Sequence, residues 1–172
     1  MNAYILCGGQ SRRMGKAKAL LPFRGMPMAM YIAQKLISSG FSNVYAVVKE
    51  SLSLDLPQLI ESATIHHPLF GVAEALQHSP KPFCLITPCD LPFVSIDTFQ
   101  TLRKKSCFTT ALATSQKQPL LGVFPKRLAS DALHYAERSL SVMNFVETSQ
   151  TFNLSACELI NINTPQNLKD HR

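Results

Sequence analysis

Short apolar runs alternate along the chain with segments in which apolar residues recur every three to four positions. The runs are typical of buried strands, and the longer spacing is typical of amphipathic helices. Strands are predicted at residues 4–7, 43–48, 63–67, 82–87, 108–114, 120–124 and 158–162. Helices are predicted at residues 27–36, 54–62, 69–78, 97–105, 126–138 and 141–147, and a C-terminal helix is predicted to begin at Thr164 and Pro165.

This alternation predicts an α/β fold. We expect a Rossmann-like three-layer sandwich, with a mostly parallel central sheet and helices on both faces. No repeat or linker-like segment interrupts the pattern, so residues 1–172 are predicted to form a single domain. In such sheets, ligands bind at the carboxyl ends of the strands. Gly8-Gly9 and Pro88-Cys89-Asp90 each follow an apolar run, and we expect both at one edge of the sheet.

The segment after the first apolar run has the chemistry of a phosphate-binding loop. Gly8 and Gly9 let the main chain approach a ligand closely. Successive backbone amides in such a loop form an anion-binding concavity, to which cationic side chains add full charges. Four of these cations lie within seven residues: Arg12, Arg13, Lys16 and Lys18. We expect a polyphosphate ligand, and the alternative is a surface turn with solvated charges.

Two better-known phosphate loops are excluded by spacing. A Walker loop needs four residues between its first glycine and Gly-Lys-Ser/Thr, but five separate Gly9 from Gly15, and Ala17 replaces the hydroxyl residue. The dinucleotide fingerprint is absent, because Gly8 and Gly9 are adjacent and no third glycine follows at the required distance.

Asp90 is the candidate metal ligand. Pro88 and Pro92 bracket it and stiffen its backbone. A rigid carboxylate beside a triphosphate suits Mg²⁺, which takes one or two carboxylates together with phosphate oxygens and water. The alternative is that Asp90 caps the turn at residues 91–95.

Charge and composition narrow the class of partner. The net charge of +6 suits an anionic ligand, but the cations are dense only in the first loop, which favours small phosphorylated substrates over nucleic acid. No apolar run approaches the length of a membrane span, and the N-terminus lacks the pattern of a signal peptide. We therefore expect a cytoplasmic protein without a membrane partner.

The five cysteines have no CxxC spacing, which argues against a metal site built from them. Cys7 and Cys84 lie in apolar runs and are predicted to be small buried thiols. Cys89 lies inside the expected site, but no histidine or second cysteine stands at ligand spacing beside it.

Residues 6–15, reading LCGGQSRRMG, together with Lys18 and Leu20-Leu21, resemble the signature loop of the sugar-nucleotide-pyrophosphorylase-like nucleotidyltransferases. Within that group the chain is most similar to the molybdenum cofactor guanylyltransferase (MobA) family. Three later stretches agree in order with the metal-binding segment, the acceptor-side strand and the closing turn of that family: residues 88–92 (PCDLP), 118–124 (QPLLGVF) and 161–165 (NINTP).

The resemblance implies a Mg²⁺-dependent transfer of GMP from GTP to molybdopterin, with transient contact to proteins that deliver molybdopterin or receive the cofactor. It places Arg13, Lys18 and Asp90 in catalysis, with Asp90 also binding the metal. Arg12 and Lys16 stay ambiguous. The residues that it implies for substrate binding are Leu6, Cys7, Gly8, Gly9, Ser11, Gly15, Lys49, Gly71, Gln118, Pro119, Asn161 and Asn163. For Asn161 and Asn163, turn formation is the equal alternative.

The chain departs from the family pattern where the base is read. The family's aspartate before its Gly-Pro-Leu-x-Gly loop has no counterpart near His66-His67, and Val48-Lys49 replaces an asparagine after the second strand. The histidine pair is expected to lie on a loop at a strand end rather than to bind a metal. Three alternatives stay open: use of CTP, a sugar-phosphate acceptor, or a non-catalytic role in nucleotide binding and cofactor handover.

Overall fold

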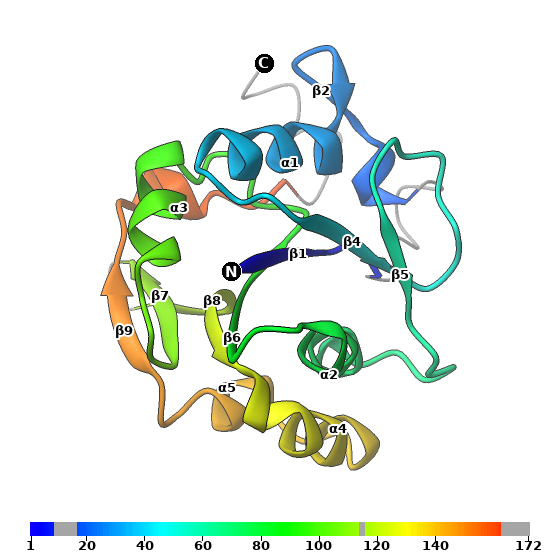
Figure 1. Cartoon of the computed structure of the whole chain (residues 1–172), viewed down its shortest axis with the longest axis vertical. Helices are drawn as coiled ribbons and strands as arrows, with labels where there is room; N and C mark the ends of the chain where they lie inside the picture. The colour runs from blue at the N-terminus through cyan, green and yellow to red at the C-terminus, as the bar shows by residue number, and fades with distance from the viewer. Residues whose placement is uncertain (9–16, 114–115, 163–172) are drawn as a thin grey trace.

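The computed structural model of the protein describes residues 1–8, 17–113 and 116–162. These residues build one seven-stranded sheet with helices on both faces (Figure 1). The strands, in sheet order, are β5 (Gln58–Ile60), β4 (Val44–Val48), β1 (Asn2–Leu6), β6 (Phe83–Pro88), β8 (Gln116–Pro125), β7 (Thr109–Ala113) and β9 (Gln150–Asn153). Among these seven, only β8 runs antiparallel to its neighbours. The predicted mostly parallel α/β sheet is confirmed.

The helices form the two outer layers. α1 (Met28–Ser38) and α3 (Ile96–Arg103) cover one face, and α2 (Pro68–His78), α4 (Ala129–Glu137) and α5 (Val142–Phe145) cover the other (Figure 1). A small hairpin of β2 (Pro22–Phe23) and β3 (Met26–Pro27) precedes α1. Single turns of 3-10 helix complete the described chain: η1 (Lys18–Leu20), η2 (Lys126–Leu128) and η3 (Ala156–Leu159).

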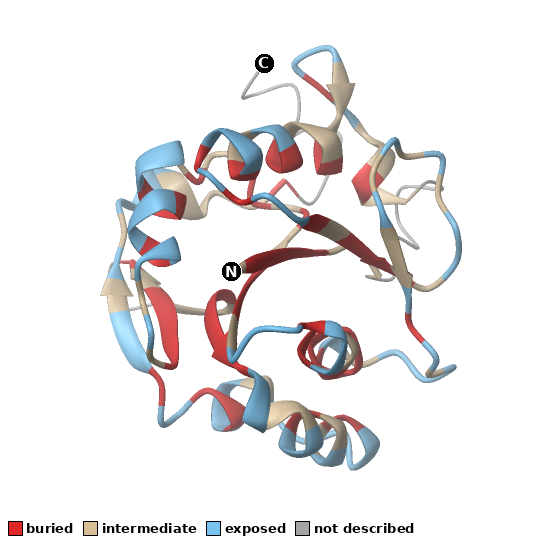
Figure 2. Cartoon of the chain, viewed as in Figure 1, coloured by how far each residue is buried: buried red, intermediate tan, exposed pale blue. Residues whose placement is uncertain are grey.

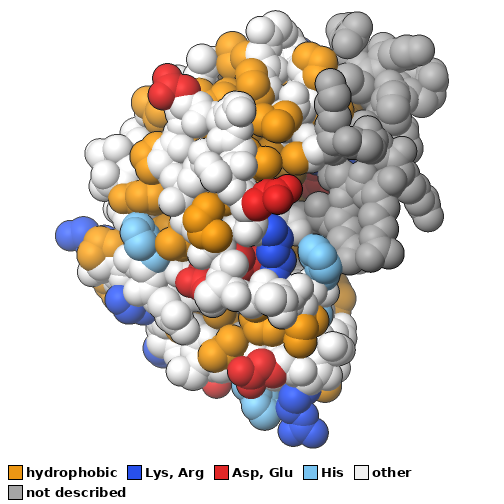
Figure 3. Space-filling view, turned by 90° about the vertical axis from the view of Figure 1, so that its right-hand side faces the viewer, with side chains coloured by type: hydrophobic (Ala, Val, Ile, Leu, Met, Phe, Trp, Pro, Cys, Tyr) orange, Lys and Arg blue, Asp and Glu red, His pale blue; other side chains and the backbone are white. Residues whose placement is uncertain are grey.

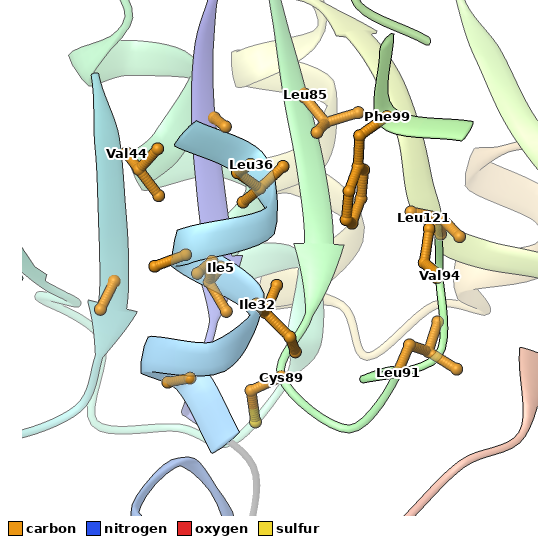
Figure 4. Close-up of a cluster of buried hydrophobic side chains, with 14 of the residues drawn as sticks. Ile5, Ile32, Leu36, Val44, Leu85, Cys89, Leu91, Val94, Phe99 and Leu121 are labelled. Atoms are coloured by element: carbon orange, nitrogen blue, oxygen red, sulfur yellow. The ribbon is translucent and has the colours of Figure 1, made fainter. Parts of the chain in front are cut away.

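Alternate residues of the interior strand β1 contribute to two separate cores. Ile5 of β1 points to the α1 and α3 side, where it joins the first cluster of buried side chains with Leu85 and Phe99 (Figure 4). Tyr4 points to the α2 side and joins the second cluster. Because β1 is buried on both faces (Figure 2), it is apolar throughout its central residues, as expected for an interior parallel strand.

Two predicted elements between β4 and α2 are wrong. Residues 54–62 form no helix, because Gln58–Ile60 instead pairs with β4 as the edge strand β5. The Gln58 side chain also bonds the backbone of Leu52 on both its polar atoms, at 2.8 Å each, which holds the preceding loop against the strand. Residues 63–67 form no strand, since this segment is a loop whose carbonyls of Ala63 and Ile65 accept hydrogen bonds from Lys49.

Two further differences between the predicted and observed elements lie in residues 150–162. The strand β9 was not predicted, because Gln150–Asn153 is polar and mostly exposed as the outermost strand beside β7. The strand predicted at residues 158–162 is wrong: η3 occupies its start, where the Glu158 carboxylate accepts hydrogen bonds from Ser95 N and Thr98 Oγ1 at 2.9 and 2.7 Å. The predicted C-terminal helix at Thr164 and Pro165 lies outside the described residues.

Local signals for helix ends agree with the structure. The Ser95 side chain accepts a hydrogen bond from Thr98 N and caps α3, a role for which serine is a preferred residue. Gly40 follows α1 with a φ of +90°, a conformation that glycine adopts without strain. None of the helices in the described part of the chain is long and apolar enough to cross a bilayer.

Candidate active site

A pocket of about 430 Å³ opens at the carboxyl ends of β1, β4 and β6. It lies where ligands bind in parallel α/β sheets. On the face of the molecule that carries β5, acidic, basic and histidine side chains gather close together (Figure 3). Seven predicted site residues line this one pocket: Leu6, Cys7, Gly8, Lys18, Lys49, Gly71 and Asp90.

Lys18 and Asp90 form an ion pair at the pocket wall. Lys18 begins η1, and Asp90 follows β6, so the two side chains come from segments 72 positions apart and meet with Nζ and Oδ2 3.5 Å from each other. Burial raises the pKa of Asp90, and the Lys18 ammonium opposes that shift. Each side chain is 23% exposed, so both are reachable from the pocket. A cation and a carboxylate therefore face one ligand space.

The end of β1 lines the pocket, but the Cys7 backbone amide does not point into it. Cys7 N donates to Val47 O at 2.8 Å, which extends the strand ladder by one residue beyond β1. The expectation that all the amides from Leu6 to Gly9 cradle the ligand is therefore wrong for Cys7. A Cβ atom added at Gly8 would lie 3.1 Å from Glu61 Oε2, so a side chain there would crowd the acidic side of the pocket.

Glu61 is a pocket residue that sequence analysis did not identify. It directly follows β5 and its side chain is only 4% exposed, yet it lines the pocket. Burial raises its pKa, while the ion pair with Lys49 (Nζ to Oε2, 3.2 Å) and a hydrogen bond donated by the Gly71 backbone oppose the rise. Recognising 58–60 as a strand would have placed this acid at a strand end, which was the missing signal.

Lys49 organises the wall around Glu61. Its ammonium contacts three acceptors: Glu61 Oε2, Ala63 O at 2.7 Å and Ile65 O at 2.9 Å. An ammonium group has three donors, so these contacts match its full capacity. Lys49 thus lines the pocket as predicted, but its geometry is that of a residue that positions Glu61 and the following loop.

The histidine pair lies on a loop, in agreement with the expectation. His67 Nδ1 accepts a hydrogen bond from Leu69 N, so His67 caps α2, and its Nε2 lies 3.0 Å from Leu140 O. With Nδ1 as the acceptor, Nε2–H donates to that carbonyl. His66 lines the pocket beside it. Among the described residues, no three His, Cys, Asp or Glu side chains are grouped closely enough to hold a metal by themselves.

The predicted acceptor-side residues that the structure describes do not themselves line the pocket. Gln118 and Pro119 belong to β8, but the β8 residue that lines the pocket is Leu120. Asn161 lies beside the segment that carries Asp90, because Ile162 N donates to Asp90 O at 2.9 Å. The remaining predicted site residues lie outside the described part of the chain: Gly9, Ser11, Arg13, Gly15 and Asn163.

A mostly parallel sheet whose carboxyl edge brings Gly8, a lysine and a carboxylate into one pocket is typical of nucleotide-binding α/β enzymes. Residues 3–151 match the family model of the MobA-like NTP transferase domain, and the chain belongs to this family. The protein is a nucleotidyltransferase, and the resemblance seen in its first loop is confirmed.

Individual relatives agree along nearly the whole chain. The chain is 28% identical to a probable molybdenum cofactor guanylyltransferase of Flavobacterium johnsoniae, covering 99% of this chain and 95% of the relative. It is 30% identical to a probable molybdenum cofactor guanylyltransferase of Trichormus variabilis, covering 98% and 88%. The crystal structure of molybdopterin-guanine dinucleotide biosynthesis protein A from Archaeoglobus fulgidus shares the fold, with a TM-score of 0.79 at 20% identity over 99% of this chain and 96% of that one.

Proposed function

We propose that this protein transfers GMP from GTP to molybdopterin, giving the guanine dinucleotide cofactor and pyrophosphate, with Mg²⁺ as the metal. The observation that carries the proposal is the meeting of Lys18, Asp90 and Gly8 in one pocket at the carboxyl edge of the sheet. The names of the relatives support the choice of base and acceptor. We also propose transient contact with the proteins that deliver molybdopterin or receive the product.

The residues of the pocket fit a magnesium ion that is shared with the substrate. Asp90 offers one largely buried carboxylate, and Mg²⁺ commonly takes one or two carboxylates with phosphate oxygens and water as its other ligands. When bound, the ion would neutralise phosphate charge and orient the reacting centre.

The side chains of this site would act mainly through position and charge. A phosphate oxygen of the acceptor attacks the α-phosphorus of the nucleotide, forming a new P–O bond as the bond to pyrophosphate breaks. Lys18 is placed to neutralise the negative charge that grows on the departing pyrophosphate. We propose the same role for Arg13, on the strength of the family resemblance.

Glu61 supports guanine as the base. A carboxylate accepts hydrogen bonds and cannot donate them while ionised. The Watson–Crick edge of guanine presents two neighbouring donors, N1–H and the 2-amino group, whereas adenine presents an acceptor at N1. Lys49 and the Gly71 backbone hold the carboxylate in place, so Glu61, directly after β5, would supply the acid that the family motif seemed to lack.

We expect Glu61→Gln to lower kcat/KM with GTP about thirtyfold, or about 2 kcal/mol, because a charge-assisted hydrogen bond is replaced by a neutral one. Glu50→Gln is the matched control, since Glu50 follows the neighbouring strand β4 and is exposed. Equal losses with GTP and ATP, or no loss, would contradict the role in base recognition.

The same residue predicts a pH effect on binding. Burial raises the pKa of Glu61, so the carboxylate becomes protonated, and loses acceptor capacity, at a higher pH than an exposed glutamate. We therefore expect GTP affinity to fall as the pH is lowered through this raised pKa. Calorimetric titration with GTP in the absence of divalent ions checks this, and the Glu61→Gln variant should lack the acidic decline.

Lys18→Met should lower the rate at least about tenfold, equivalent to about 1.4 kcal/mol of transition-state stabilisation. The substitution removes the charge that faces the pyrophosphate but keeps an apolar stem. Lys81→Met, which removes an exposed lysine far from the pocket, is the control and should react normally. A Lys18→Met rate within twofold of the wild type would reject the assigned role.

The direct test is an assay of pyrophosphate release with molybdopterin and each nucleotide in turn, with the product identified by mass. We expect release with GTP only, and a product whose mass equals molybdopterin plus GMP. Preference for CTP would assign another base to the same chemistry, release only with sugar phosphates would assign another acceptor, and tight GTP binding without release would indicate a non-catalytic handover protein.

A further inference from the structure

Two cysteines stand directly opposite each other where β1 and β6 end. The last paired residues of these parallel strands are Leu6 and Pro88, so the next residues along each chain are Cys7 and Cys89. Cys89 N donates to Leu6 O at 3.1 Å, which shows that the two chains stay side by side through this position. Residues that are paired across parallel strands point to the same face of the sheet.

Their side chains meet in the core beneath α1. Cys7 and Cys89 are each 6% exposed and belong to the same buried cluster, and Cys89 lies at one edge of it (Figure 4). The neighbouring Cys89 side chain and burial raise the pKa of the Cys7 thiol well above its usual range. Neighbouring strands lie about 4.8 Å apart, and disulfide-bonded residues have Cα separations of about 4.4–6.8 Å. The backbone geometry thus already suits a disulfide.

This pair is also placed at the centre of the site. Both cysteines line the pocket, which gives small solutes a route to the two sulfur atoms. The residues that follow them are Gly8 and Asp90, one at each side of the ligand space. The other three cysteines lack this arrangement: Cys84 is buried in the cluster on the opposite face, Cys107 contacts Thr109 and Gln150, and Cys157 is exposed beside Ser155.

We propose that Cys7 and Cys89 are a modification site, at which a hydroperoxide reversibly forms a disulfide that switches the enzyme off. The Cys89 sulfur attacks the terminal peroxide oxygen, because the raised pKa of Cys7 disfavours its thiolate; the O–O bond breaks, and the departing alcohol takes the proton of the Cys89 thiol. The second sulfur then attacks the resulting sulfenic acid, the S–O bond breaks, and water leaves with the second proton. In total, two thiols and one hydroperoxide give one disulfide, one alcohol and one water.

The new bond would act on the two sides of the ligand space at once. A disulfide holds its sulfur atoms about 2.05 Å apart, far closer than two thiols that are not bonded. Closing that distance pulls the segments bearing Gly8 and Asp90 together and alters the position of the carboxylate relative to Lys18. Because both thiols line the pocket, a nucleotide bound there would cover them and slow the oxidation.

The test is mild treatment of the full-length protein with hydrogen peroxide, followed by blocking of free thiols and peptide mapping by mass spectrometry. We expect one intramolecular disulfide that joins the peptides containing Cys7 and Cys89, and its recovery as free thiols after dithiothreitol. The mapping needs no substrate, so it succeeds or fails independently of the proposed guanylyl transfer. Oxidation of the exposed Cys157 shows that the peroxide has acted. A disulfide between other cysteines, or no disulfide in a sample in which Cys157 is oxidised, would overturn the proposal.

The functional consequence is measured as the rate of each oxidised sample divided by that of the same sample when reduced. For the wild type and for Cys107→Ala, the matched control, we expect a loss of about tenfold or more that dithiothreitol reverses. Cys89→Ala and Cys7→Ala should each retain most of their own reduced rate. If either variant does not fold, the other provides the comparison. A mapped Cys7–Cys89 disulfide with an unchanged rate would overturn the switch.

Discussion

Asp90→Asn should lower the rate of nucleotidyl transfer by about a thousandfold or more, which corresponds to about 4 kcal/mol of transition-state stabilisation. The substitution keeps the shape of the side chain and removes the charge that we assign to the divalent ion. It also leaves the Lys18 ammonium without its partner at 3.5 Å, so the electrostatics on both sides of the ligand change together. The effect should exceed that of Lys18→Met, because Asp90 serves the metal as well as the lysine.

The fold of this variant should be intact. Burial raises the pKa of Asp90, so the ionised carboxylate is disfavoured where it stands, and a neutral amide relieves that cost. Thermal unfolding followed by circular dichroism should therefore give a midpoint no lower than that of the wild type by more than a few degrees. Asp55→Asn, at an exposed loop position, is the control for the loss of one carboxylate. Near-normal turnover by Asp90→Asn would remove the central element of the proposed mechanism.

Gly122→Ala should have the largest effect on stability among the substitutions considered, a loss of about 3 kcal/mol or more. A Cβ atom at Gly122 would lie only 2.0 Å from the carbonyl oxygen of Thr109, and this neighbour is the backbone of the adjacent strand β7. Gly122 faces Thr110 next to the register shift in the β7–β8 ladder, so the clash cannot be relieved without separating β7 from β8.

The prediction is checked by comparing the free energies of unfolding of Gly122→Ala and Gly25→Ala in urea. Gly25 has a φ of +84° but nothing within 4 Å of an added Cβ, so its substitution costs only the backbone term, roughly 1–2 kcal/mol. Equal shifts in the midpoints of the two variants would contradict the steric argument for Gly122.

The nucleotide half of the site was predictable because its residues follow strongly apolar strands. Gly8 and Asp90 each come directly after such a run, and the rule that ligands bind at the carboxyl edge of a parallel sheet brought them together. The apolar spacing of α1 and α2 and the Ser95 cap of α3 were equally visible in the sequence.

The side of the pocket that carries Glu61 and Lys49 was not predictable from the same signals. β5 is a three-residue edge strand paired on one side, so it carries little apolar pattern, and Glu61 was hidden in a segment assigned to a helix. The role of Lys49 depends on two carbonyl groups 14 and 16 positions away, a tertiary contact that no local pattern encodes. β9 was not predicted for a related reason, because this mostly exposed outer strand carries a single apolar residue, Phe152.

The reversed direction of β8 determines which of its ends lies at the pocket. Since β8 alone among the described strands runs against β6, its first residues rather than its last lie toward the catalytic edge, where Leu120 meets the pocket. The first residues of β8 therefore lie beside the carboxyl ends of β1 and β6, which approach the pocket from the opposite direction. Substitutions at the start of β8 can therefore reshape the pocket while Gly8 and Asp90, which follow β1 and β6, stay unchanged.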